Sequence, residues 1–236
     1  DKTDGFLKKT RMLTKNDFGG MFLQPGVAEL TMACLCIVMT LHGGVHTACG
    51  TFFVFSDYMK PAVRMAALME LPVKFIWTHD AFRVGEDGPT HEPVEHEAQI
   101  RLMEKLQNHS GRNSVLVLRP ADVYETTWAW RIAMENRLTP SALILSRQNI
   151  KDLPVLDAAK SRYEEAEQAR KGAYIVSDDA NPQIVLLATG SEVSTLLRVQ
   201  NFCARRVSAY VSYQFLVKEH SVRKVKNIKK QYCLVE

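Results

Sequence analysis

The sequence lacks any long hydrophobic run. Its longest apolar stretches, residues 32–39 and 115–118, fall far short of the ~18 residues that a membrane-spanning helix needs. It does not open with a charged segment followed by an apolar one, and its five cysteines are odd in number and scattered. Because secreted scaffolds are rich in paired cysteines, we expect a soluble, cytoplasmic protein that contacts no membrane.

An excess of charge is also missing from most of the chain. The net charge is +4, but residues 203–236 carry eight basic and two acidic residues, so residues 1–202 sum to −2. This basic tail has no interleaved aromatic residues of the kind that bind RNA, and we expect a solvated terminus and no nucleic-acid partner. With 236 residues and 46% hydrophobic residues, the chain can form one large or two small globular domains.

Short β-branched or aromatic runs alternate with helical patterns from Thr51 onward, which is typical of β-α units around a parallel sheet. Strands are predicted at residues 51–55, 73–79, 114–119 and 141–147, and helices at 28–40, 58–70, 94–106 and 122–136. The strands are nearly continuous apolar runs, as expected where helices cover both faces of a sheet. The predicted fold class is therefore α/β.

A smaller, partial α/β unit follows. Residues 148–171 are polar and have little to bury, whereas strands are predicted at 173–176, 183–188 and 207–212. An ATGSE turn from Ala188 to Glu192 leads into a helix. We therefore predict a first domain at residues 1–150, a linker at 151–171 and a partial domain at 172–236.

Polar residues gather where the predicted strands end, which is where open α/β sheets bind ligands. One strand ends at His79, the loop after it contains Asp87 and His91, and another strand ends at Arg147. Imidazoles and a carboxylate suit the hydroxyl groups of a sugar, and a guanidinium suits a phosphate. The alternatives are structural histidines, a solvated acidic loop and an Arg147 that pairs with a linker glutamate.

Glu29 and an aromatic triplet are further candidates. Glu29 opens a helix that is apolar almost all round, so it is either a favourable charge at a helix N-terminus or a buried carboxylate with raised proton affinity. Phe52, Phe55 and Tyr58 are spaced by three and either pack in the core or cradle a flat heterocycle. The string from His91 to His96 resembles HExxH with the second histidine one position late, so we predict no metal site within this chain.

Taken together, these strings resemble transketolases, in their pyrimidine-binding domain and the start of their C-terminal domain. The resemblance covers nearly all of residues 1–200. It is carried by LHGG at Leu41, TFFVFSDY at Thr51, AVRMAALM at Ala62, THD at Thr78, GEDGPTHEPVE at Gly85, RPAD at Arg119, ALILSRQN at Ala142 and ATGSEVS at Ala188. GEDGPTHEPVE followed by SRQN is a specific combination.

The resemblance implies a thiamine diphosphate site. Glu29, in GVAEL, matches the glutamate that bonds N1′ of the aminopyrimidine and favours the imino tautomer, which takes the proton from thiazolium C2. Phe52, Phe55 and Tyr58 match the pocket around that ring. The implied reaction, part of the pentose phosphate pathway, moves a two-carbon ketol unit from a ketose phosphate to an aldose phosphate.

The resemblance also assigns the substrate contacts. His79, Asp87 and His91 match residues that contact the hydroxyl groups of the donor sugar, and Arg147 matches a ligand of the substrate phosphate. Together with Glu29, the two histidines are the expected catalytic residues.

This sequence departs from the family pattern at several positions and lacks one of its motifs. Ala28 and Leu30 replace the arginine and histidine that usually flank the glutamate, residues 108–113 form an insertion, and similarity fades beyond Leu196. The family's Gly-Asp-Gly string, which holds the diphosphate and Mg²⁺ in an N-terminal domain, does not occur in the sequence. The resemblance therefore implies half a site, completed in a homodimer or by a separate diphosphate-binding half.

The sequence leaves three alternatives open. Deoxyxylulose phosphate synthase and the β subunit of 2-oxo acid dehydrogenases share the layout, although GEDGPTHEPVE and SRQN fit transketolase better. A truncated, non-catalytic copy that serves as a dimerisation module is the third.

Overall fold

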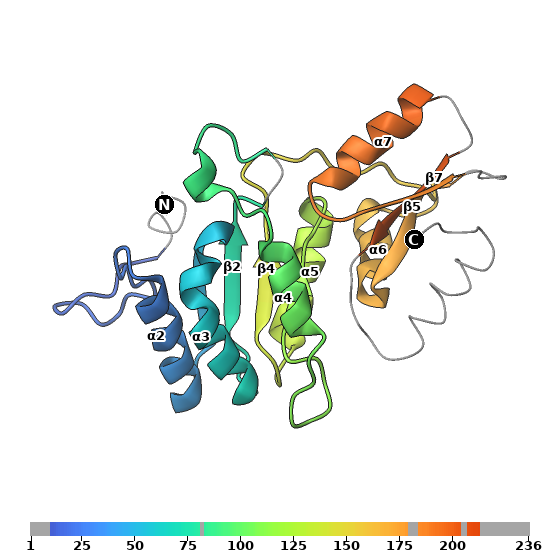
Figure 1. The fold of residues 1–236 in the computed structure, drawn as a ribbon. Coiled ribbons are helices and arrows are strands. Elements are labelled where there is room, and N and C mark those ends of the chain that lie inside the picture. Colours follow the sequence, from blue (N-terminus) through green and yellow to red (C-terminus); the bar gives the residue numbers. More distant parts are fainter. Residues whose placement is uncertain (1–9, 81–82, 179–183, 204–206, 213–236) are drawn as a thin grey trace.

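The computed structural model describes residues 10–80, 83–178, 184–203 and 207–212. These residues form a four-stranded sheet with flanking helices, followed by a smaller three-stranded sheet (Figure 1). None of the helices within these ranges is both long and apolar enough to cross a bilayer. This architecture confirms the predicted α/β fold.

The larger sheet is entirely parallel. Its strands, in spatial order, are β1 (Ala48–Phe52), β2 (Lys74–Thr78), β4 (Ser141–Ile144) and β3 (Leu116–Leu118). Parallel strands need long crossover connections, and here those connections are helical. All four strands therefore end on the same side of the sheet. This carboxyl-terminal side, called the edge of the sheet below, carries the candidate site.

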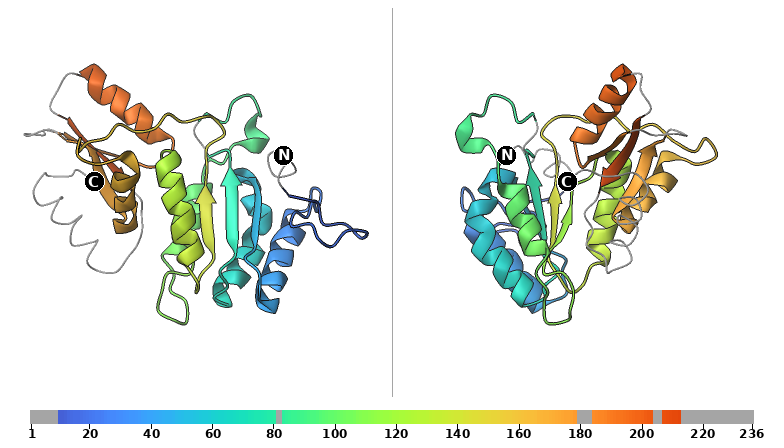
Figure 2. Two further views of the ribbon diagram at one scale, coloured as in Figure 1. Left: turned by 180° about the vertical axis from the view of Figure 1, so that it is seen from behind. Right: turned by 45° about the vertical axis from the view of Figure 1, so that its right-hand side comes forward.

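Helices cover both faces of this sheet. They are α2 (Glu29–His42), α3 (Ser56–Leu68), α4 (His96–Glu104) and α5 (Val123–Glu135). Figure 2 shows α3 and α4 on one side of the strands and α5 on the other. Side chains alternate accordingly along β4, because Ala142 and Ile144 join the core cluster of α3 whereas Leu143 joins the cluster beneath α5.

The first strand begins and ends earlier than the predicted 51–55. It starts with the small residues Ala48, Cys49 and Gly50, and the chain after Phe52 turns into a 3-10 helix, η1 (Phe53–Phe55). Gly50 suits this position because an added Cβ would lie only 3.1 Å from the Ile76 carbonyl oxygen. Two backbones approach closely here and require small residues between them. Strand propensity does not predict such a requirement.

The smaller sheet has the order β5 (Ala173–Ser177), β7 (Val207–Ser212), β6 (Ile184–Ala188), with β7 antiparallel to β5 and parallel to β6. Helix α7 (Glu192–Cys203) follows the ATGSE turn, as predicted. The basic tail lies outside the described residues from residue 213 onward. The domain boundaries at 150 and 171 stay predictions.

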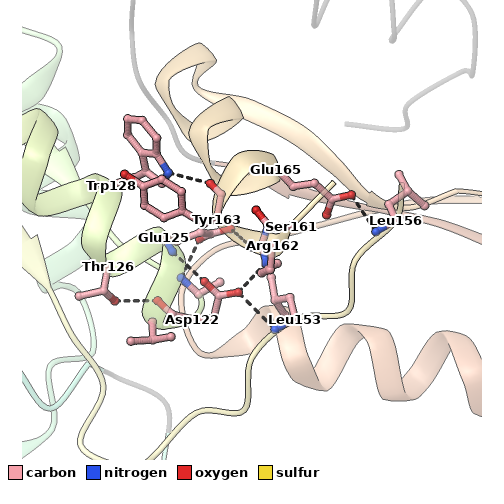
Figure 3. Close-up of polar contacts among 12 residues, drawn as sticks. Asp122, Glu125, Thr126, Trp128, Leu153, Leu156, Ser161, Arg162, Tyr163 and Glu165 are labelled. Atoms are coloured by element: carbon pink, nitrogen blue, oxygen red, sulfur yellow. Dashed lines mark hydrogen bonds and ion pairs between the residues drawn. The ribbon is translucent and has the colours of Figure 1, made fainter. Parts of the chain in front are cut away.

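A buried ionic network joins the segment before the smaller sheet to the first unit (Figure 3). Helix α6 (Arg162–Ala166) and the 3-10 helix η3 (Glu167–Lys171) pack against α5. The Arg162 side chain donates to Asp122 Oδ2 at 2.7 Å, to Glu125 Oε1 at 3.0 Å and to Tyr174 Oη at 2.5 Å. The expectation that residues 148–171 have little to bury is therefore wrong, because charged side chains are buried here through mutual pairing.

Candidate active-site edge of the sheet

A row of aromatic rings crosses the carboxyl end of β1. Phe52 ends the strand, Phe55 ends η1 and Tyr58 lies in the first turn of α3. The Phe52 and Phe55 rings stack with centroids 6.0 Å apart, and the Phe55 and Tyr58 rings with centroids 6.1 Å apart. Phe52 and Phe55 are half-buried and Tyr58 is 62% exposed, so the row runs from the core to an open surface.

His79 follows β2 and lies against this row. Its ring stacks on Phe52 with centroids 3.5 Å apart, and its Nδ1 lies 3.0 Å from the Thr78 hydroxyl. Its backbone is left-handed, with φ 59°, which is uncommon outside glycine. Burial lowers the pKa of His79, and the nearby Asp87 carboxylate opposes this shift.

The loop after β2 brings His91 to the same place. His91 ends a short 3-10 helix, η2 (Pro89–His91), and meets Phe55 edge-on with ring centroids 5.2 Å apart. It also meets Phe52 edge-on at 6.0 Å, and its Nδ1 lies 2.9 Å from the Thr90 hydroxyl. The two imidazoles therefore share one aromatic neighbour, although they come from different segments.

Arg147, just beyond β4, meets the same loop. Its Nε lies 3.9 Å from Asp87 Oδ2, and both side chains are partly exposed. A Cβ added to Gly85, which has φ 94°, would lie 3.4 Å from the guanidinium. The ion pair is thus with the loop and not with a linker glutamate, and it places a cation beside the two histidines.

This edge of the sheet can bind a polyhydroxylated anion. His79 and His91 can donate to or accept from hydroxyl groups, the Asp87 carboxylate can accept, and the Arg147 guanidinium can bind a phosphate. The structure brings all four predicted substrate-binding residues together with the aromatic row. The roles given to them remain predictions.

Glu29 opens α2 and is half-buried. Figure 1 shows the first turns of α2 and α3 at the same edge of the sheet as the strand ends. The expectation that α2 is buried all round is wrong for this chain, because Leu30, Val38 and Leu41 are about half exposed or more. One face packs on α3 and β1 through Ala33, Cys36 and Ile37, and the other face has no cover within the described residues.

Sequence reasoning missed a second polar cluster. Ligand atoms of Asp57, Glu95 and His96 lie within 4.8 Å of one another, and His96 Nε2 is 3.1 Å from Asp57 Oδ2. The Lys60 ammonium pairs with the same Asp57 carboxylate, so the cluster already contains a cation. Asp57 comes from α3 and His96 from α4, and only the packing of these helices brings them together.

Comparison with known proteins confirms the resemblance. The family model of the transketolase pyrimidine binding domain matches residues 1–152. A transketolase of Geobacillus stearothermophilus is 50% identical over 182 residues, which are 76% of this chain and 25% of that protein. A transketolase of Bacillus subtilis is 44% identical over 196 residues, which are 82% of this chain and 27% of that protein.

A solved structure shares the fold. The transketolase of Pichia stipitis, in a crystal structure described as a complex with sedoheptulose 7-phosphate, matches with a TM-score of 0.76 and 30% identity. The match covers 92% of this chain and 32% of that one. The chain thus spans about a quarter of the length of the curated relatives named above. On the strength of the pyrimidine-binding-domain match and these relatives, the chain belongs to the transketolase family.

Proposed function

We propose that this chain supplies the pyrimidine-binding half of a thiamine diphosphate site that transfers a two-carbon ketol unit between sugar phosphates. The observation that carries the proposal is the meeting of two groups at one edge of the sheet. One group is the stacked aromatic row, and the other is the set of hydrogen-bonding and charged side chains beside it. A coenzyme ring and a phosphorylated sugar need such neighbouring surfaces.

The aromatic row suits the aminopyrimidine ring. Phe52, Phe55 and Tyr58 lie within 25° of parallel with their neighbours in the row, so a flat heterocycle can continue the stack. Tyr58 leaves the outer end of the row open. When bound, thiamine diphosphate supplies the nucleophile and the electron sink for ketol transfer. The part of Glu29 is to hydrogen-bond the pyrimidine nitrogen and hold a proton there.

The polar cluster suits the sugar phosphate. Arg147 provides a partly exposed guanidinium for the phosphate, while its distance of 3.9 Å from Asp87 leaves its donors free to engage a stronger ligand. His79 and His91 orient hydroxyl groups and move protons at them. Because the folded state lowers the pKa of His79, this imidazole is neutral near pH 7 and can act as an acceptor.

The remaining half of the site has to come from residues outside this sequence. These 236 residues contain no Gly-Asp-Gly string, so the ligands of the diphosphate and of Mg²⁺ are assigned to a diphosphate-binding domain outside them. The apolar face of α2 that the described residues leave uncovered, with Leu30, Val38 and Leu41, supports a further domain or subunit packed there. A helix that is apolar on all sides is stable only when all sides are covered. Either a second, complete subunit or a separate diphosphate-binding half can cover it.

Reconstitution tests the proposal. The purified chain is assayed for ketol transfer from xylulose 5-phosphate to ribose 5-phosphate, alone and with the diphosphate-binding half of a transketolase. We expect turnover only in the mixture. Product analysis with glyceraldehyde phosphate plus pyruvate separates ketol transfer from deoxyxylulose phosphate synthesis. Absence of binding to the added half, or of any turnover in a stable complex, contradicts the proposal and favours a non-catalytic module.

Glu29→Gln tests the cofactor assignment in the same mixture. The variant removes the ionisable proton site while keeping the size of the side chain, so we expect loss of hydrogen exchange at thiazolium C2 with an unchanged far-UV spectrum. Glu167→Gln is the matched control, because Glu167 is exposed in η3, away from the aromatic row. Retained exchange in Glu29→Gln counts against the assigned role.

A further inference from the structure

We propose that Asp80 is a positioning residue for His79, and that Ser191 holds Asp80 in place. Ser191 lies in the second unit, which is the smaller sheet with helix α7. The turn before α7 would then support the sugar-binding edge of the first sheet. The inference deepens the proposed function and rests on it in one respect only, namely that His79 contacts the substrate.

The backbone at this point is constrained. His79 has φ 59°, and a residue other than glycine keeps this conformation only where its surroundings enforce it. The next residue, Asp80, is 1% exposed, and its N–H donates to the Leu145 carbonyl at 3.1 Å. The chain after His79 is thus fixed to the end of β4, and the side chain of Asp80 points into the protein while His79 lies on Phe52.

The Asp80 carboxylate is held by donors from two units. Its Oδ2 accepts from Arg119 Nη2 at 2.8 Å and from Ser191 Oγ at 2.8 Å. Arg119 follows β3 in the first unit, and Ser191 precedes α7 in the second. A carboxylate this deeply buried is stable only with such partners, so its position is strongly determined.

The second unit also engages Arg119 directly. Arg119 Nη2 donates to Glu192 Oε1 at 2.7 Å, and its Nη1 donates to Thr189 Oγ1 at 3.0 Å and lies 3.1 Å from Glu97 Oε2. Gly190 donates its N–H to the Arg119 carbonyl at 3.1 Å, and a Cβ there would come within 2.7 Å of Arg119 Nε. The turn therefore fits closely around the arginine that binds Asp80.

Ser191 is thus linked to His79 through one hydrogen bond, to Asp80, and the peptide bond between Asp80 and His79. The charged and titratable groups that act on its imidazole are Asp87, Arg147, His91 and Asp80. Of these, only Asp80 is buried, and only Asp80 is bonded to the second unit among the contacts of the described residues. Loss of the Ser191 hydroxyl changes no charge in this set, so it isolates the positional effect.

Nuclear magnetic resonance of the full 236-residue chain tests the inference without ligand or catalysis. Because the His79 ring stacks on Phe52, its carbon-bound protons carry a ring-current shift that depends on ring position. We expect Ser191→Ala to move these signals toward their values in an unfolded chain. Ser194→Ala is the matched control, since the one hydrogen bond of its hydroxyl within the described residues goes to the Ser191 carbonyl, at 3.3 Å. Asp80→Asn is the second variant, and we expect it to move the signals in the same direction.

The outcomes separate positioning from stability. Unchanged His79 signals in Ser191→Ala, with a lowered unfolding midpoint, overturn the inference and leave Asp80 with a structural role alone. Equal shifts in Ser191→Ala and Ser194→Ala overturn it as well. If the signals shift as expected but reconstitution yields no ketol transfer, the inference holds and only the proposed function fails.

Discussion

Removal of the Arg162 guanidinium gives the most direct test of how the two units hold together. This one cation faces two carboxylates, Asp122 and Glu125, whose side chains are fully buried, and Arg162 itself is 4% exposed at its side chain. Asp122 also caps α5 by accepting from the Glu125 N–H at 2.8 Å. Arg162→Met keeps an unbranched apolar stem but removes the guanidinium that donates to both carboxylates.

The expected cost follows from desolvation. Breaking a buried pair by removing one partner typically costs about 3–5 kcal/mol, because an uncompensated charge stays in the interior. For a protein of this size, that corresponds to a fall of about 6–20 °C in Tm. Arg162→Lys keeps the charge but loses the forked geometry, so it should fall between Arg162→Met and the original chain.

Urea unfolding followed by circular dichroism measures these differences. Lys160→Met is the matched control, because the Lys160–Asp157 pair lies close by along the chain but is about half exposed. We expect this control to change the unfolding free energy by about 0.5 kcal/mol or less. Equal effects of Arg162→Met and Lys160→Met would contradict this expectation, since the buried network would then contribute no more than a surface pair.

Three further predictions follow from single sites. Burial lowers the pKa of His79, so the unfolded state binds more protons and stability is lost as the pH falls from about 6.5 through the folded pKa. Urea titrations at neutral and mildly acid pH should therefore show a smaller loss for His79→Gln than for the original chain; an equal loss contradicts the assignment. The hydrogen bond with Cys36 and burial raise the pKa of Cys49, whereas Cys34 is exposed, so peptide mapping should show iodoacetamide modifying Cys34 well before Cys49. Gly190→Ala should cost about 1–3 kcal/mol in urea unfolding, since φ is 58° and a buried arginine occupies the Cβ position; a neutral result would show that the turn is loose.

Local pattern predicted most of the secondary structure because the strands are apolar and short and the helices are bounded by clear signals. Asp122 illustrates this, since its carboxylate accepts from the Glu125 backbone and begins α5 where the sequence indicates. The strand predicted at 51–55 lies instead at Ala48–Phe52, for a tertiary reason. Gly50 fits there because the neighbouring backbone comes close, and an apolar run alone does not predict such a contact.

The candidate site was predicted through two separate signals. Topology predicted that residues after parallel strands meet at one edge, and it did bring His79 and Arg147 to the same region. The resemblance added the aromatic row, where spacing alone had left core packing open. The stacking of His79 on Phe52 and the edge contact of His91 were not predictable, because they depend on the path of the loop between them.

The fold class, the family and the identity of the side chains at the sheet edge follow from the sequence alone, because these depend on local periodicity and on motifs that are contiguous in the chain. Which distant charges pair with each other depends on the three-dimensional packing. Arg119 meets Asp80 and Glu192, and Arg162 meets Asp122, across long separations in sequence. A charge is tolerated in the interior only when another element supplies its counterpart at hydrogen-bond distance, and that depends on packing in three dimensions.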